Sequence, residues 1–110
     1  MSANAPSNRG LPNIKSMTGA LAADNSRVNR FVDGLLAQVD GLIDAAKIKD
    51  WNELGRISMV LSLGAKAYGY QQLHESAERL TKAVREPENE LEIKRSLMKV
   101  IGNCGRARKP

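Results

Sequence analysis

The chain has 110 residues, of which 42% are hydrophobic and only four are aromatic. This size allows one small domain with a single core, and the scarcity of aromatic residues favours helices over a sheet. The formal net charge of +5 is concentrated at the two ends, because residues 31–103 carry ten basic and eleven acidic side chains. A nucleic-acid-binding face is therefore not expected.

Several other classes of protein are also excluded by composition. No apolar run approaches the roughly 20 residues that span a bilayer, and the first ten residues lack the basic-then-apolar order of a secretory signal. One cysteine, Cys104, and one histidine, His74, give neither an internal disulfide nor a metal-ligand cluster. We expect a cytoplasmic protein without a metal or cofactor.

The N-terminal region has little periodicity. Residues 1–12 are rich in serine, asparagine, proline and glycine, and we predict that they are disordered. Residues 11–23 are a weak helical candidate, in which Ile14, Met17 and Leu21 recur roughly in phase. We predict a helical domain over residues 13–105 and a basic tail over residues 106–110.

Four amphipathic helices are predicted after this lead-in. The first covers residues 28–46 as one continuous stripe, with Gly34 and Gly41 either in close helix contact or tolerated at the surface. The second follows the capping residue Asp50 and ends at Gly69; the third covers residues 70–84 and ends before Pro87; the fourth runs from about residue 88 to about 105. The short links between them predict an antiparallel up-down four-helix bundle.

The second helix carries hydrophobic residues on two faces. Its inner stripe consists of Leu54, Ile57, Leu61, Ala65 and Tyr68. Met59 and Leu63 fall on the opposite face, with Val60 beside them and the cations Arg56 and Lys66 around them. This apolar centre with a polar rim is typical of a protein-binding surface, although the predicted lead-in helix around residues 14–21 could also cover it.

The same stretch resembles the central helix of histidine phosphotransfer (HPt) domains, whose pattern is approximately D-W-x-x-L-x-x-x-A-H-x-L-K-G-x-A-x-x-Y-G. The matching residues are Asp50, Trp51, Leu54, Leu61, Ala65, Tyr68 and Gly69. Softer similarity to one bacterial subgroup extends over residues 14–104. The resemblance implies a four-helix signalling domain that meets a response-regulator receiver domain or a histidine kinase.

The residues that would carry phosphotransfer are replaced. The phosphoryl-accepting histidine of the pattern falls on Met59, the lysine on Ser62 and the glycine on Leu63. A thioether cannot carry a phosphoryl group, Ser62 supplies no charge, and Leu63 would crowd the approach of a partner. We therefore expect a protein that is not an enzyme and binds its two-component partner without transferring phosphate, through Arg56, Met59, Val60, Ser62, Leu63 and Lys66.

Two alternatives remain open at the level of sequence. His74 could act as a substitute phosphoryl acceptor, which would make the chain an active phosphocarrier, although a half-covered histidine at the margin of a helix stripe also explains it. The chain could instead be a helical adaptor outside two-component signalling. Cys104 is in phase with Leu97 and Ile101, and we expect it to be a buried structural thiol.

Overall fold

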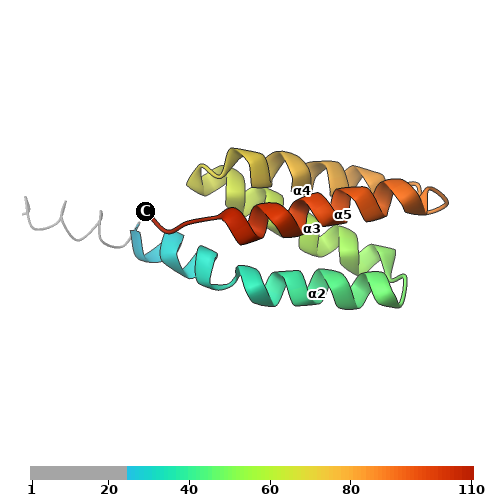
Figure 1. Cartoon of the computed structure of the whole chain (residues 1–110), viewed down its shortest axis with the longest axis horizontal. Coiled ribbons are helices and arrows are strands. Elements are labelled where there is room, and N and C mark those ends of the chain that lie inside the picture. The colour runs from blue at the N-terminus through green and yellow to red at the C-terminus, as the bar shows by residue number, and fades with distance from the viewer. Residues whose placement is uncertain (1–24) are drawn as a thin grey trace, which may run out of the picture.

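The described part of the chain is entirely helical. The computed structural model describes residues 25–110, so the predicted disorder of residues 1–12 and the weak helix over 11–23 lie outside it. Within this range four labelled helices follow one another and no strand is present: α2 (Leu35–Lys47), α3 (Trp51–Tyr68), α4 (Gln71–Ala83) and α5 (Glu90–Arg106) (Figure 1). The prediction of an all-helical protein is confirmed.

The first predicted helix is not continuous. Residues 25–33 are helical, Gly34 forms a turn, and α2 begins at Leu35 (Figure 1). The Gly34 N–H is shared between the carbonyls of Arg30 (3.0 Å) and Phe31 (3.2 Å), which tightens the turn at a residue with low helix propensity. The prediction of one uninterrupted helix over residues 28–46 was wrong because the hydrophobic stripe continues across this break.

The segment before α2 is held by Phe31 and by the C-terminus. The ring of Phe31 lies 5.5 Å from that of Tyr68 and 6.0 Å from that of Tyr70, between centroids. The Tyr70 hydroxyl donates to the Arg108 carbonyl, and Lys109 forms an exposed 2.7 Å ion pair with Asp33. The predicted basic tail is therefore in contact with the folded domain, and its first residue belongs to α5.

The ends of α3 are formed as the sequence predicts. The Asp50 carboxylate accepts a 3.1 Å hydrogen bond from the Glu53 N–H, which satisfies one of the free donors at the helix start. Gly69 adopts the left-handed conformation (φ 85°), and the next N–H, of Tyr70, donates to the Ala65 carbonyl at 2.8 Å. These two caps fix α3 as an 18-residue helix.

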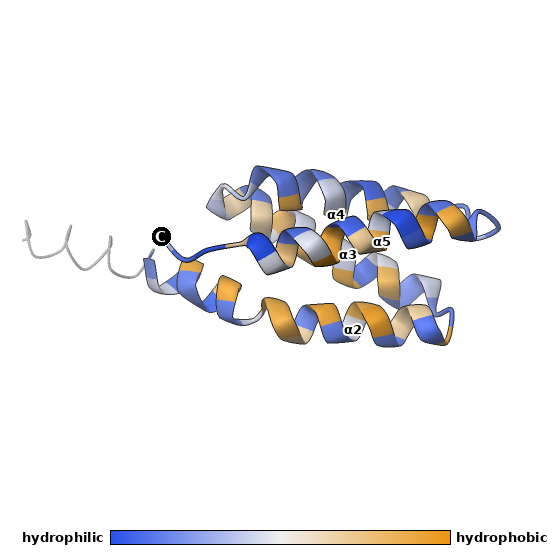
Figure 2. Ribbon diagram, viewed as in Figure 1, coloured by the Kyte–Doolittle hydropathy of each residue, from blue (hydrophilic) through white to orange (hydrophobic). Residues whose placement is uncertain are grey.

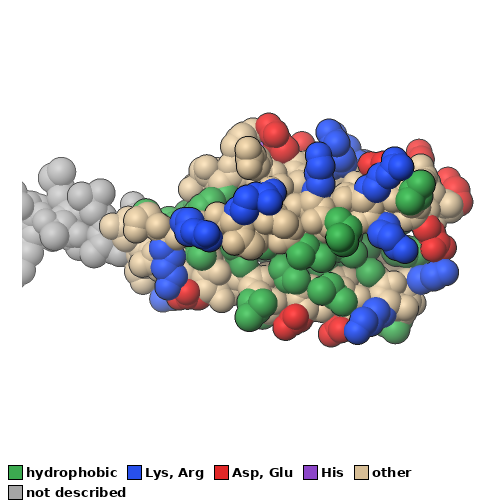
Figure 3. Space-filling model, in the orientation of Figure 1, with side chains coloured by type: hydrophobic (Ala, Val, Ile, Leu, Met, Phe, Trp, Pro, Cys, Tyr) green, Lys and Arg blue, Asp and Glu red, His purple; other side chains and the backbone are tan. Residues whose placement is uncertain are grey.

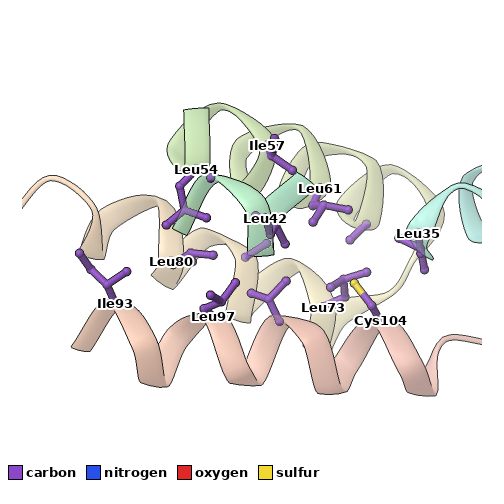
Figure 4. Close-up of a cluster of buried hydrophobic side chains, with 14 residues drawn as sticks. Leu35, Leu42, Leu54, Ile57, Leu61, Leu73, Leu80, Ile93, Leu97 and Cys104 are labelled. Carbon is purple, nitrogen blue, oxygen red and sulfur yellow. The ribbon is translucent and has the colours of Figure 1, made fainter. Parts of the chain in front are cut away.

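One hydrophobic core joins the four helices. Consecutive helices pack against each other, and α2 also contacts α5. Bands of hydrophobic and polar residues alternate along each helix (Figure 2), and the buried hydrophobic side chains meet between them (Figure 4). Four residues of the inner stripe of α3, Leu54, Ile57, Leu61 and Ala65, are buried as predicted, whereas Tyr68 at its end is only partly buried. The core residues are Leu35, Leu42, Ala45, Leu54, Ile57, Leu61, Ala65, Leu73, Ala77, Leu80, Ile93, Leu97, Val100 and Cys104.

Close packing and a partly buried hydrogen bond join α3 to its neighbours. A Cβ on Gly41 of α2 would lie 3.1 Å from Ile57 Cδ1, so this glycine allows the close helix contact that its position suggested. The hydroxyls of Ser58 and Thr81 are 2.8 Å apart and link α3 to α4. In the part of the chain that the structure describes, no helix has the length and apolar character needed to cross a bilayer.

Candidate functional site

Three large hydrophobic side chains are exposed on the outer face of α3. The exposed fractions of Met59, Val60 and Leu63 are 48%, 45% and 62%. We call these three residues the α3 patch. The inner stripe of the same helix is buried from Leu54 to Ala65, so the two faces predicted from the sequence are both present.

The two cations predicted around the α3 patch are exposed but differ in their pairing. Arg56 donates two hydrogen bonds to the Glu53 carboxylate, at 2.8 and 2.7 Å. These bonds lower the pKa of Glu53 and raise that of Arg56, and they offset part of the Arg56 charge. Lys66 is exposed and has no ion-pair partner among residues 25–110.

Ser62 does not belong to this exposed surface. Its residue is only 7% exposed, and its hydroxyl lies 3.0 Å from Nδ1 of His74 on α4. At 100° per residue, Ser62 falls between the buried stripe and the outer face, on the side of α3 that contacts α4. The prediction that Ser62 contacts a partner is therefore not supported by its position, and the surface consists of Arg56, Met59, Val60, Leu63 and Lys66.

His74 is half-buried and its two ring nitrogens have different surroundings. Nδ1 lies 3.0 Å from the Ser62 carbonyl as well as from the Ser62 hydroxyl. Because a carbonyl oxygen can only accept, this contact favours the tautomer with the proton on Nδ1. The lone pair is then on Nε2, for which no hydrogen-bond partner is found within the described residues.

An open groove of about 850 Å³ adjoins the α3 patch. It lies where the start of α3 meets the end of α4, and a Cβ on Gly55 would be only 3.1 Å from Val84 Cγ2 there. Met59 is at its edge. The groove combines apolar walls with basic side chains and the acidic Asp50, and its lining includes Lys49, Asp50, Trp51, Gly55, Arg56, Met59, Val84, Arg85 and Pro87.

The groove was not predicted from the sequence. Trp51 and Val84 are far apart in the chain: Val84 is an ordinary position in its own hydrophobic stripe, and Trp51 belongs to the HPt-like pattern. The signal that could have indicated it is Gly55, a glycine inside a strong helix at the point where another helix comes close.

Within residues 25–110, Cys104 and the acidic side chains form no metal site or reactive-thiol site. Cys104 is buried, and desolvation raises the pKa of its thiol to about 11, which keeps it protonated at neutral pH. This agrees with the structural role expected for it. Over residues 25–110, no group of three or more histidine, cysteine, aspartate or glutamate side chains is placed to hold a metal ion.

Comparison with known proteins does not assign the chain to a family. No family model, curated protein or solved structure gives a significant match.

Proposed function

We propose that this protein is a non-catalytic, HPt-like signalling module in the cytoplasm that binds a response-regulator receiver domain or a histidine kinase without transferring phosphate. The observation that carries the proposal is the α3 patch: Met59 is 48% exposed at the position where the HPt pattern has its phosphoryl acceptor. A surface of this kind, apolar at its centre and basic at its rim, is suited to protein binding.

The arrangement of the helices supports this proposal. The capping residue Asp50 and the left-handed Gly69 both lie where the HPt pattern requires a helix start and a tight reversal. Consecutive helices contact each other across short links, and the last helix closes onto α2. We infer from these contacts that the helices form the antiparallel up-down bundle expected of an HPt-like domain.

The chemistry around Met59 argues against phosphotransfer at this position. Methionine offers no nucleophilic nitrogen or oxygen, and Leu63, one turn further along α3, is 62% exposed and crowds the approach. Ser62 stands where the family has its lysine, but it is buried against His74. A lysine at this position could supply a charge only if the contact with His74 were lost. Restoring the histidine alone, as Met59→His, is therefore expected to give little or no phosphotransfer.

Binding to the α3 patch can be tested with one charged substitution and one matched control. Leu63→Asp places a charge in the patch, whereas Ile48→Asp places the same charge after the end of α2, on a residue that is 75% exposed. The probes are purified receiver domains and histidine kinases encoded in the same genome, measured by titration calorimetry. We expect Leu63→Asp to abolish binding and Ile48→Asp to leave it unchanged, because an unpaired charge is costly only where it becomes buried.

Three results would contradict the proposal. Failure of the wild-type chain to bind any receiver or kinase would favour an adaptor outside two-component signalling. Equal losses from the two variants would show that the α3 patch is not the contact surface. A large fall in melting temperature for Leu63→Asp, but not for Ile48→Asp, would show that the chain itself covers the patch.

His74 supports a second candidate function, that of an active phosphocarrier. Its contact with the Ser62 carbonyl leaves the lone pair on Nε2, which is the arrangement that a nucleophilic imidazole needs. The test is incubation with phosphorylated receivers and with a small phosphodonor, followed by intact-mass measurement of the wild type and of His74→Gln. A phosphoryl adduct present only in the wild type would establish this function and refute the non-transferring one.

A further inference from the structure

A second exposed hydrophobic surface lies away from the α3 patch, on α2 and α5. Leu36 on α2 is 74% exposed, and Leu91 and Met98 on α5 are 60% and 66% exposed. Figure 3 shows hydrophobic side chains gathered along the line where these two helices meet. Large apolar side chains on two adjoining helices are unusual on a surface that contacts only water.

The faces of α2 can be assigned from its contacts. Gly41 faces Ile57, which identifies the side of α2 that contacts α3. At 100° per residue, Leu36 and Ile43 fall on the other side of the buried stripe, toward α5. Asp40 lies between them in the sequence and is exposed, and Ile43 is half-buried, so this side of α2 carries an apolar–acidic–apolar sequence in which Leu36 is the more exposed apolar residue.

The faces of α5 follow in the same way. Ser96, Lys99 and Asn103 line a cleft that α5 forms with α4, which identifies that side of the helix. Met98 lies on the opposite side, toward α2, and Leu91 shares its face because the two are seven residues apart. Lys94 and Arg95 are placed between them. This side of α5 therefore carries an apolar–basic–apolar sequence.

The charges on the two helices are opposite, and within the described residues they have no partners. Asp40 and Asp44 of α2 are exposed and form no ion pair there, and the same holds for Lys94 and Arg95 of α5. The acidic residues of α5 are already engaged: Glu90 pairs with Lys49 at 3.2 Å, and Glu92 accepts a hydrogen bond from Ser96.

We propose that the surface formed by Leu36, Asp40 and Ile43 of α2 with Leu91, Lys94, Arg95 and Met98 of α5 binds a second copy of this chain. One helix supplies acidic and the other basic side chains, each beside exposed apolar ones, so the surface is complementary to itself. In a two-fold dimer the charged and apolar side chains of both helices find partners at once, because α2 of each copy lies against α5 of the other. The α3 patch, on another helix, remains free to bind a different partner.

The polarity of the helices agrees with this pairing. The Lys49–Glu90 ion pair places the end of α2 beside the start of α5. When α2 of one copy lies antiparallel on α5 of the other, Lys47 at the end of α2 approaches the acidic first turn of that α5. The acidic middle of α2 then lies over the basic part of α5.

The test is sedimentation equilibrium of the full chain from low micromolar to submillimolar concentration. We expect a monomer–dimer equilibrium in the wild type, and only monomer in Met98→Asp. Leu63→Asp is the matched control, since it adds the same charge at a similar exposed fraction, 62%, on α3. It should dimerise like the wild type, which separates a failure of this proposal from a failure of the proposed function.

A charge-reversal series tests the complementarity and does not depend on whether Met98→Asp folds. Asp40→Lys should weaken the dimer about tenfold or more, because each substitution acts twice in a two-fold interface. Adding Lys94→Glu and Arg95→Glu to that variant should restore the dissociation constant to near the wild-type value. A wild-type chain that stays monomeric throughout, or a dimer that neither substitution affects, would overturn the proposal.

Discussion

The contact between Phe31 and Gly64 offers a sharp test of how the segment before α2 is held. A Cβ on Gly64 would lie 2.5 Å from Phe31 Cε1 and 3.0 Å from Cδ1, distances at which the ring must move. The ring also packs near Tyr68 and Tyr70, which limits the directions in which it can move. Gly64→Ala should therefore displace Phe31 from the end of the bundle.

The expected magnitude is the sum of two opposing effects. Replacing a glycine inside a helix by alanine stabilises the folded state by about 1 kcal/mol, whereas overpacking a well-packed contact costs about 1–3 kcal/mol. We expect Gly64→Ala to lower the free energy of unfolding by about 1 kcal/mol. Gly102→Ala is the matched control, because its nearest contacts are the Arg106 guanidinium nitrogens at an ordinary 3.6 Å. It should raise stability by about 1 kcal/mol.

The assay is urea denaturation monitored by helical circular dichroism at low protein concentration. The two variants should differ by about 2 kcal/mol, which corresponds to roughly 10 °C in melting temperature for a domain of this size. In a Phe31→Ala background the ring is absent, and Gly64→Ala should become stabilising by about 1 kcal/mol. Equal stabilisation by Gly64→Ala and Gly102→Ala in the wild-type background would refute the packing of Phe31 on Gly64.

Three further predictions concern the helix ends and the buried thiol. Asp50→Ala removes the cap of the Glu53 N–H and should cost about 0.5–2 kcal/mol of unfolding free energy; Asp50→Asn, which keeps an accepting oxygen, should cost less. Gly69→Ala forces a side chain into a left-handed residue (φ 85°) and should cost about 1–2 kcal/mol in the same assay; an unchanged midpoint would contradict this conformation. Burial raises the pKa of Cys104 to about 11 in the folded state, above its value in the unfolded chain. The neutral thiol therefore contributes its full stability below about pH 8, and this contribution is lost as the pH rises toward 11. The fall in unfolding free energy between these pH values should accordingly be smaller for Cys104→Ala than for the wild type.

Local patterns in the sequence were sufficient to predict α3, α4 and α5 and the two ends of α3. The period of the hydrophobic residues and the chemistry of Asp50 and Gly69 depend on neighbours within one or two turns, so they can be predicted without knowing the fold. The same reasoning placed Met59 and Leu63 on the exposed face of α3, because the direction of a side chain around a helix follows from its position in the sequence.

Contacts between distant segments were decided only by the tertiary structure. The hydrophobic stripe continues through Gly34, so its period does not predict the break there, nor does it predict that Phe31 beyond the break lies against Gly64 of another helix. Ser62 lies at the boundary of two faces, and its burial depends on His74 arriving from α4. Likewise, the exposed surface on α2 and α5 requires that two helices far apart in the chain lie side by side. Periodicity describes one helix at a time, whereas burial at its margins is set by the helix that packs beside it.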